Sequence, residues 1–314
     1  MRYSNCEKSV RSGVKKIYVM SSRSIMYCRL TIHQLVSTKT FSSCLRLLSI
    51  VGHLGKKNDV ILCGDPKKAD QHVIFFGGDV QDYKENMEGH RDNKRYSMWN
   101  LKDTASLISK KFPSSAIFVI RPSRMHLKTF SVYQNFVTSN DFGCPTHSPD
   151  EEALEHLREL YKNAVSASTS NDSCELNVRE SKPLVLMGFS KGCIVLNQIL
   201  YELEKMNTGD IPDLKEFVKS VKDIYWLDGG HNGGKNTWVT DSSPLQALAQ
   251  LDTKIHVHVT PYQIKDEMRP WIGKEEKQFI KTLKKYGANI TRNFHFESEE
   301  RCIENHFKVL EAFE

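Results

Sequence analysis

Long apolar stretches are missing from this chain of 314 residues. A membrane-spanning helix needs roughly 18 consecutive apolar residues, and no run in the sequence approaches that length. The composition, with 39% hydrophobic and 26% charged residues, is ordinary for a water-soluble protein. We therefore expect no transmembrane segment, and a chain of this length fits one core with an additional segment.

Closely spaced cysteines are also missing. The sequence has no Cys-x-x-Cys pair and no short cysteine spacing suited to zinc. Scattered cysteines in a chain this long are most simply reduced or buried thiols, so we expect a reducing compartment and no disulfide scaffold. The eight cysteines are Cys6, Cys28, Cys44, Cys63, Cys144, Cys174, Cys193 and Cys302.

Acidic residues are almost absent from the first 58 positions. This stretch holds 11 Lys or Arg and a single acid, Glu7, a net charge of +10, whereas the rest of the chain has a net charge of −4. A basic, Ser-rich, acid-poor N-terminus is typical of an organelle-targeting segment, and a tail that binds acidic partners is the alternative. No nucleic-acid partner is expected, because no recognisable binding module follows and the remaining chain is slightly acidic.

Beyond residue 58, short β-rich runs alternate with helical patterns. Repeated strand and helix units predict an α/β fold with a mostly parallel sheet and helices on both faces. Ser148, followed by acids at 150–152, is interpreted as a helix start, and Gly287 as a helix stop. The predicted strands are 72–81, 116–123, 183–190, 222–230, 254–263 and 290–298, the predicted helices are 97–112, 148–165, 192–206 and 273–287, and 166–182 is predicted to be a surface loop.

The stretch PLVLMGFSKGCIVLNQILYELEK, residues 183–205, passes from an apolar run through a tight turn into a helical pattern. Ser190 stands in the turn between Gly188 and Gly192, the G-x-S-x-G spacing of a nucleophile elbow. Side chains at the two glycine positions would collide with neighbouring backbone. The elbow would lift the serine hydroxyl above the sheet and point the backbone N–H of Lys191 at a developing oxyanion. An ordinary strand-to-helix turn is the alternative interpretation.

A nucleophilic serine needs a base, and in α/β-hydrolases an acid and then a histidine follow the serine along the chain. Asp266 lies just beyond the penultimate predicted strand, and His306 follows the last one. We predict that Asp266 and His306 are the acid and the base. Asp228, at the end of the preceding strand, is the alternative acid. Asp266 could instead be a capping or surface acid, and His306 a helical residue without a catalytic role.

The second oxyanion donor is expected in the loop after the strand 72–81. Gly77 and Gly78 would let backbone N–H groups approach a substrate closely, and we predict Gly78 or Asp79 as the donor. The alternative is that the glycine pair serves a tight turn.

Two other patterns suggest different chemistry. GGHNGGKN, residues 229–236, has the glycine and lysine spacing of a phosphate-binding loop, but Asn236 stands where that loop needs Ser or Thr, and no apolar helix follows. His256 and His258 share one face of a strand, but no Asp-His pair follows that would complete a metal site. We therefore expect neither a cofactor nor a metal, and interpret His231 as a loop residue.

Four stretches carry a resemblance to a known family: LMGFSKGCIVLNQIL, HVTPYQIKDEMRPWIGKEEKQF, FFGGDVQDYKENM and RPSRMHLKTFSVYQNFV. They resemble an α/β-hydrolase-like family that includes a human mitochondrial chromosome 2 open reading frame product. The similarity runs from about residue 45 to the C-terminus. Members are described as serine-hydrolase-like proteins linked to mitochondria and respiratory function. Matched by position, the resemblance implies Ser190, Asp266 and His306 as a triad-like set and implies no substrate.

Together these observations predict a basic extension at residues 1–44, which we interpret as a mitochondrial targeting segment, and an α/β-hydrolase domain at 45–314. The expected function is hydrolysis of an ester or thioester of a small acyl or lipid-like substrate in mitochondria, with a cytoplasmic or secreted location as the alternative. The alternative from another class is a catalytically silent hydrolase-fold protein that binds a partner protein in mitochondria.

Overall fold

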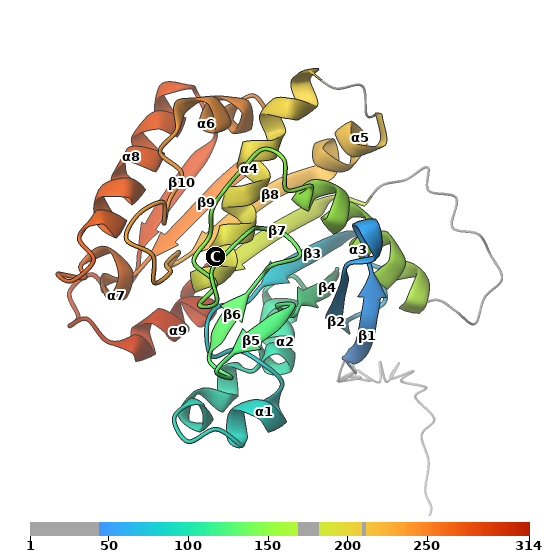
Figure 1. Ribbon diagram of the computed structural model, residues 1–314, viewed down its shortest axis with the longest axis horizontal. Coiled ribbons are helices and arrows are strands. Elements are labelled where there is room, and N and C mark those ends of the chain that lie inside the picture. Colours follow the sequence, from blue (N-terminus) through green and yellow to red (C-terminus); the bar gives the residue numbers. More distant parts are fainter. Residues whose placement is uncertain (1–43, 169–181, 209–211) are drawn as a thin grey trace, which may run out of the picture. The chain divides into compact units, whose positions relative to one another are not determined.

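An eight-stranded sheet forms the centre of the structure (Figure 1). The computed structural model describes residues 44–168, 182–208 and 212–314, all within one compact unit, Phe41–Glu314. The targeting segment predicted at 1–44 and the loop predicted at 166–182 thus fall almost entirely outside the described residues. In spatial order the strands are β1 (Leu45–Val51), β2 (Lys57–Cys63), β4 (Ser115–Ile120), β3 (Gln71–Phe76), β7 (Leu184–Phe189), β8 (Val221–Leu227), β9 (Lys254–Val259) and β10 (Ile290–Phe294).

The sheet is mostly parallel, as predicted. β2 pairs antiparallel with both β1 and β4, and every other neighbouring pair is parallel. All residues of β4 and β7 are buried, because helices cover both faces of the sheet and leave no polar side for these strands. Continuous apolar runs such as AIFVI and LVLM are the sequence pattern that this burial requires.

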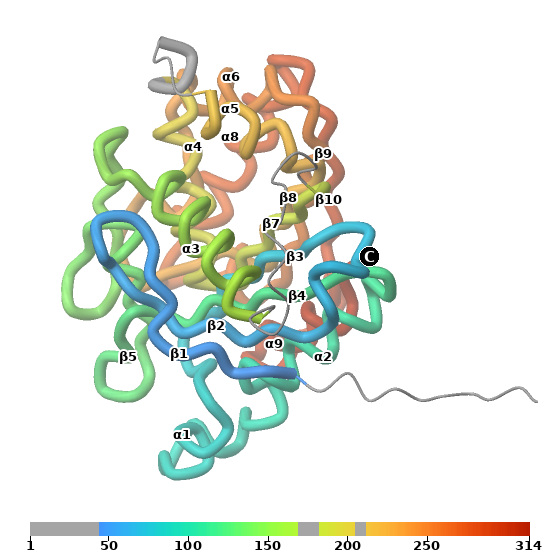
Figure 2. The backbone as a smooth tube through the Cα atoms, turned by 90° about the vertical axis from the view of Figure 1, so that its right-hand side faces the viewer, coloured from blue at the N-terminus to red at the C-terminus, as the bar shows by residue number. Residues whose placement is uncertain are grey.

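Helices pack on both faces of the sheet, as Figure 2 shows. Their apolar side chains fall into two clusters separated by the sheet. One cluster includes residues of α3 (Ala153–Ser168), α4 (Cys193–Thr208), α5 (Pro212–Ser220), α6 (Ser242–Ala249) and α8 (Trp271–Lys285). The other includes residues of α2 (Leu101–Lys111) and α9 (Ile303–Ala312).

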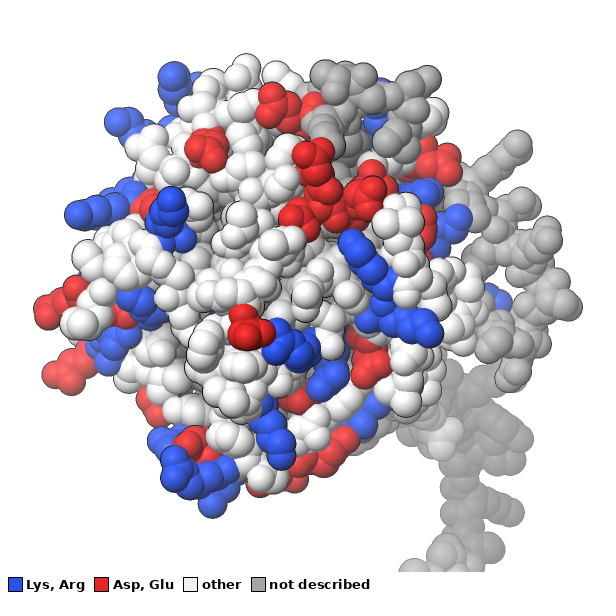
Figure 3. All heavy atoms as spheres, viewed as in Figure 1, with Lys and Arg blue, Asp and Glu red and all other residues white. Residues whose placement is uncertain are grey.

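Shorter elements complete the fold. They are the hairpin of β5 (Arg124–His126) and β6 (Phe130–Val132), the short helices α1 (Lys84–Glu88) and α7 (Pro261–Ile264), and the 3₁₀ turns η1 (His53–Gly55), η2 (Asn93–Trp99) and η3 (Ser190–Gly192). On the face in Figure 3, Lys and Arg side chains are interspersed with Asp and Glu. Among the residues described, no helix has both the length and the apolar character needed to cross a membrane.

The start of α3 differs from the prediction. We expected this helix to begin near Ser148, but it begins at Ala153. The N–H groups of Ala153 and Leu154 donate to the two carboxylate oxygens of Glu202, at 2.9 and 2.8 Å, and Glu202 lies on α4. A side chain from another helix therefore satisfies the orphan donors of the first turn, and no local sequence signal marks this cap.

Two cysteines also differ from the expectation of reduced thiols. Cys44 and Cys63 form a disulfide that joins the edge strand β1 to β2. Cys144, Cys193 and Cys302 are free thiols, as expected. The sequence did not predict β1 because most of its side chains are exposed, with Leu48 62% accessible, and its pattern LRLLSIV does not alternate.

Candidate active site

A strained turn carries Ser190 between β7 and α4. The residue has φ +53°, a conformation that costs energy for any side chain and is typical of functional sites. A Cβ at Gly188 would lie 2.8 Å from Cα of Cys193, and a Cβ at Gly192 would overlap the carbonyl oxygen of Phe76. Both positions therefore require glycine, which is the physical reason for the G-x-S-x-G spacing.

The loop after β3 lies directly against Ser190. A Cβ at Gly78 would come within 2.6 Å of Cβ of Ser190, so the glycine allows this close approach. The N–H of Gly78 donates to Oε1 of Gln81 at 2.9 Å and is not available to a substrate in this arrangement. The N–H of Asp79 donates to no protein acceptor in the described part of the chain. Of the two donors that we predicted from the sequence, Asp79 is therefore the one left open.

His306, on α9, is held by a buried carboxylate. Its Nδ1 lies 2.6 Å from Oδ2 of Asp228, which follows β8. Thr260 donates its N–H to one oxygen of Asp228 and its hydroxyl to the other, at 2.7 and 2.6 Å. These donors satisfy both carboxylate oxygens of Asp228, which is fully buried. When Nδ1 of His306 carries the proton and donates to Asp228, Nε2 is the unprotonated nitrogen of the ring.

The predicted contact between Asp266 and His306 is wrong. Asp266 forms ion pairs with Arg269 and Arg301, both at 2.7 Å, and accepts the N–H of Met268. Burial acts to raise the pKa of Asp266, but the three donors outweigh it and lower the pKa below its ordinary value. Two guanidinium groups thus bind this carboxylate, and Asp228, at the end of the neighbouring strand β8, contacts the imidazole instead.

Aromatic rings fix the imidazole plane of His306. Phe189, the residue before the serine, stacks on it at a centroid distance of 4.6 Å, and the ring of Tyr262 lies at 4.8 Å on a tilt. Ser190 and His306 line the same cavity, of about 80 Å³. The Ser190 hydroxyl makes no hydrogen bond to His306 or to any other described residue. The hydrogen bond between a nucleophile and its base is often long without substrate and shortens when substrate binds.

A buried ion pair joins the elbow to the loop after β3. The ammonium of Lys191 is fully buried and lies 2.8 Å from the carboxylate of Asp79 and 2.7 Å from the carbonyl oxygen of Phe142. Ser131 donates its N–H to the same carboxylate and its hydroxyl to the carbonyl of Gly78. Burial raises the pKa of the Asp79 carboxyl above its ordinary value, and Lys191 acts against that rise. The pair fixes the position of the Asp79 backbone N–H relative to Ser190.

The other sequence candidates have structural partners. His256 lies 2.8 Å from Asp223, and His258 lies 2.8 Å from His295. Among the described residues, no group of three or more potential ligands could hold a metal ion. His231 is in a loop as expected, but it also lines the Ser190 cavity. Sequence reasoning did not assign roles to Thr260, Tyr262, Gln263 and Arg269, although all of them follow β9, where polar residues at a strand end were the available signal.

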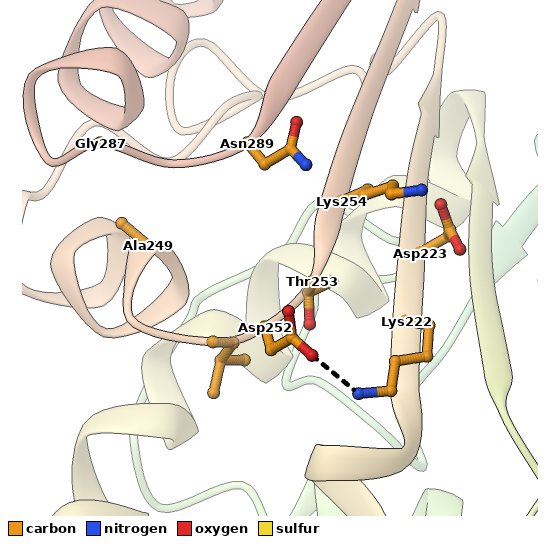
Figure 4. Close-up of a pocket in the computed structure, with 9 residues that line it drawn as sticks. Lys222, Asp223, Ala249, Asp252, Thr253, Lys254, Gly287 and Asn289 are labelled. Carbon is orange, nitrogen blue, oxygen red and sulfur yellow. Dashed lines mark hydrogen bonds and ion pairs between the residues drawn. The ribbon is translucent and has the colours of Figure 1, made fainter.

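A larger cavity, of about 350 Å³, lies at the opposite ends of the strands (Figure 4). It lies at the amino ends of β8 and β9, where Lys222 forms a 3.1 Å ion pair with the exposed Asp252. Ligands of open α/β sheets bind outside the carboxyl ends of the strands, and Ser190 lies at that end. We therefore assign the candidate site to the smaller cavity.

The sheet order, with β2 reversed and a serine elbow after β7, defines an α/β-hydrolase fold. This chain belongs to the C2orf69 family, whose profile matches residues 46–181 and 165–289. It is 39% identical over 322 residues to the human mitochondrial protein C2orf69, covering 87% of this chain and 83% of the human one. The zebrafish (Danio rerio) homolog is 40% identical over 292 residues, covering 86% and 85%. The relatives are named as mitochondrial proteins, in agreement with the predicted location.

Solved structures of similar fold include esterases. The esterase Est22 matches with a TM-score of 0.47 and 12% identity, covering 85% of this chain and 74% of that one. Brefeldin A esterase, described as a bacterial homologue of human hormone-sensitive lipase, matches with a TM-score of 0.42 and 12% identity, covering 85% and 71%.

Proposed function

We propose that this protein is a serine hydrolase of esters or thioesters, with Ser190 as nucleophile, His306 as base and Asp228 as the orienting acid. The observation that supports this most strongly is the combination of a strained Ser190 and a His306 that line one cavity, with Nδ1 of the imidazole 2.6 Å from Asp228. A structural serine or a surface histidine would not require this arrangement.

In the proposed mechanism, Oγ of Ser190 attacks the carbonyl carbon while Nε2 of His306 takes the hydroxyl proton. The backbone N–H groups of Lys191 and Asp79 donate to the oxyanion, and Asp228 stabilises the imidazolium. The C–O or C–S bond then breaks as the imidazolium protonates the leaving group. Water then attacks the acyl-serine and gives a proton to His306. The acyl–Oγ bond breaks as the imidazolium returns that proton to Oγ, which releases the carboxylic acid and restores Ser190 and His306.

A fluorophosphonate probe tests the nucleophile. We expect covalent labelling of the intact protein at Ser190, identified by mass spectrometry of the modified peptide, and no labelling after Ser190→Ala. Ser220→Ala is the matched control because Ser220 is buried to the same degree, 7% exposed, and donates only to Phe217 on its own helix. This control should label like the parent protein.

Equal labelling of the parent protein and Ser190→Ala would reject the proposed nucleophile. A folded parent protein that takes up no probe would instead favour the catalytically silent binding protein.

A further inference from the structure

One wall of the Ser190 cavity is polar and carries a positive charge. Its lining includes His231, Asn232, Gln263 and Arg269 in addition to Ser190 and His306. The same lining contains the apolar residues Val80, Ile303 and Phe307, so the site offers apolar surface beside these polar groups. The polar groups are available to a substrate that carries a polar group of its own.

Arg269 brings a guanidinium that its carboxylate partner does not fully neutralise. Asp266 accepts hydrogen bonds from both Arg269 and Arg301, so one carboxylate faces two guanidinium groups. The Nη1 of Arg269 donates to the carbonyl of His231 at 3.4 Å, and its Nη2 has no acceptor among the described residues. Nη2 of Arg269 is thus available to a ligand in the cavity that Arg269 lines.

Gln263 adds a buried amide without a partner. The residue is only 3% exposed, and its Oε1 makes no hydrogen bond in the described part of the chain. A Cβ at Gly230 would overlap this amide, so the glycine leaves the space in which the amide lies. A buried amide without partners costs free energy unless a ligand or water satisfies it. The amide nitrogen Nε2 makes no hydrogen bond to a described residue and, unlike Oε1, is not fully buried, so it is the donor that a ligand in the cavity can reach.

Asp79 is the carboxylate that lines the cavity, and Lys191 and Ser131 bind it. Asp228, whose partners are Thr260 and the His306 imidazole, is not among the lining residues. Burial lowers the pKa of His231 to about 4, so this imidazole is neutral at pH 7. The surplus charge at Arg269 and Arg301 is therefore not offset by another group that lines the cavity.

We propose that the site accepts short esters or thioesters whose acyl chain ends in a carboxylate, which Arg269 and Gln263 bind while Ser190 attacks the scissile carbonyl. This specificity rests on the proposed hydrolase function. The cavity of about 80 Å³ is small beside the roughly 300–1,000 Å³ of typical ligand pockets, which favours a short acyl chain. A long lipid chain would extend beyond this cavity.

A matched pair of esters tests the specificity. Ethyl hydrogen succinate carries the terminal carboxylate, and ethyl levulinate replaces that carboxylate with a methyl ketone of similar size. We expect kcat/KM of the parent protein to be roughly 100-fold higher for the charged ester. Arg269→Gln and Gln263→Leu should each reduce this ratio at least tenfold, and Arg269→Lys should retain part of it. Arg292→Gln is the control, because Arg292 lies on β10, outside the cavity lining, and forms a similar ion pair with Glu276 of α8.

A binding measurement separates this proposal from the proposed chemistry. Succinate should bind the Ser190→Ala variant in calorimetry, and Arg269→Gln in the same background should abolish the binding. Equal kcat/KM for the two esters in a protein that labels with fluorophosphonate would overturn the specificity and leave the hydrolase function intact. Absence of both labelling and hydrolysis, with succinate still bound through Arg269, would reject the chemistry and retain the anion site. Absence of succinate binding would overturn the anion site.

Discussion

Asp228 and Asp266 follow neighbouring strands, yet their hydrogen-bond donors differ in kind. Neutral donors from Thr260 hold Asp228, which leaves the negative charge to act on His306. Cationic donors from two arginines hold Asp266 and neutralise it. Asp228 also has φ +46°, a strained backbone conformation of the kind found at functional sites. The geometry around each carboxylate, and not its position in the sequence, separates the two roles.

Replacing each carboxylate by Asn tests this assignment. Asp228→Asn should lower the rate of fluorophosphonate labelling by about 10⁴-fold, because the amide no longer stabilises the imidazolium or selects the tautomer. Asp266→Asn should change the rate far less, since its carboxylate contacts only arginines and one backbone N–H. Labelling rates at fixed probe concentration provide the measurement. A larger loss for Asp266→Asn would return the acid to the position predicted from the sequence.

At the scale of elements, local patterns were predicted and contacts across the fold were not. The elbow lies within five consecutive residues, and β3, β4 and β7 are continuous apolar runs, so sequence reasoning found them. The start of α3 depends on Glu202, about 50 residues further along the chain, and the partner of His306 depends on which strand end lies nearest in space. Neither contact leaves a signal at its own position in the sequence.

The cap of α3 makes stability depend on pH. Burial raises the pKa of Glu202 from 4.5 to about 7 even though it accepts hydrogen bonds from Ala153, Leu154 and Gln198. The folded state therefore holds a proton between pH 4.5 and 7 that the unfolded chain has lost. The stability from this proton is fully present below pH 4.5 and is lost as the pH rises through 7. We expect this loss to be about 3 kcal/mol.

Urea unfolding at several pH values measures this effect. The free energy of unfolding of the parent protein, relative to Glu202→Gln, should fall by about 3 kcal/mol between pH 4.5 and 8, because the glutamine does not titrate. Glu216→Gln is the control at an exposed glutamate and should leave the slope unchanged. Parallel curves for the parent protein and Glu202→Gln would contradict the raised pKa.

At the scale of the whole molecule, the basic segment 1–43 precedes a hydrolase fold in a family named for mitochondria. We expect import into isolated mitochondria, scored by protection from added protease, to be lost when residues 2–43 are deleted. The reason is that the membrane potential and the import receptors act on a basic, acid-poor N-terminus. The truncated chain should still unfold cooperatively, because no element of the described sheet is removed.

A full-length variant without the positive charges of this segment is the control for the deletion. Changing the eight Lys and Arg residues of segment 1–43 to Gln should impair import as much as the deletion does. Undiminished import of the truncated chain would show that the targeting information lies elsewhere.

The Cys44–Cys63 disulfide has a mechanical consequence. A chain pulled from its N-terminus would normally lose the edge strand β1 first, one hydrogen bond at a time. The disulfide links the residue before β1 to the last residue of β2. The pulling force therefore bypasses β1 and acts on the hydrogen bonds between β2 and β4. Threading of the oxidised protein through a narrow translocation pore would then require the interior of the sheet to shear. On the import route proposed above, the bond would therefore form after the chain has been threaded, and the oxidised fold would then resist further pulling from the N-terminus.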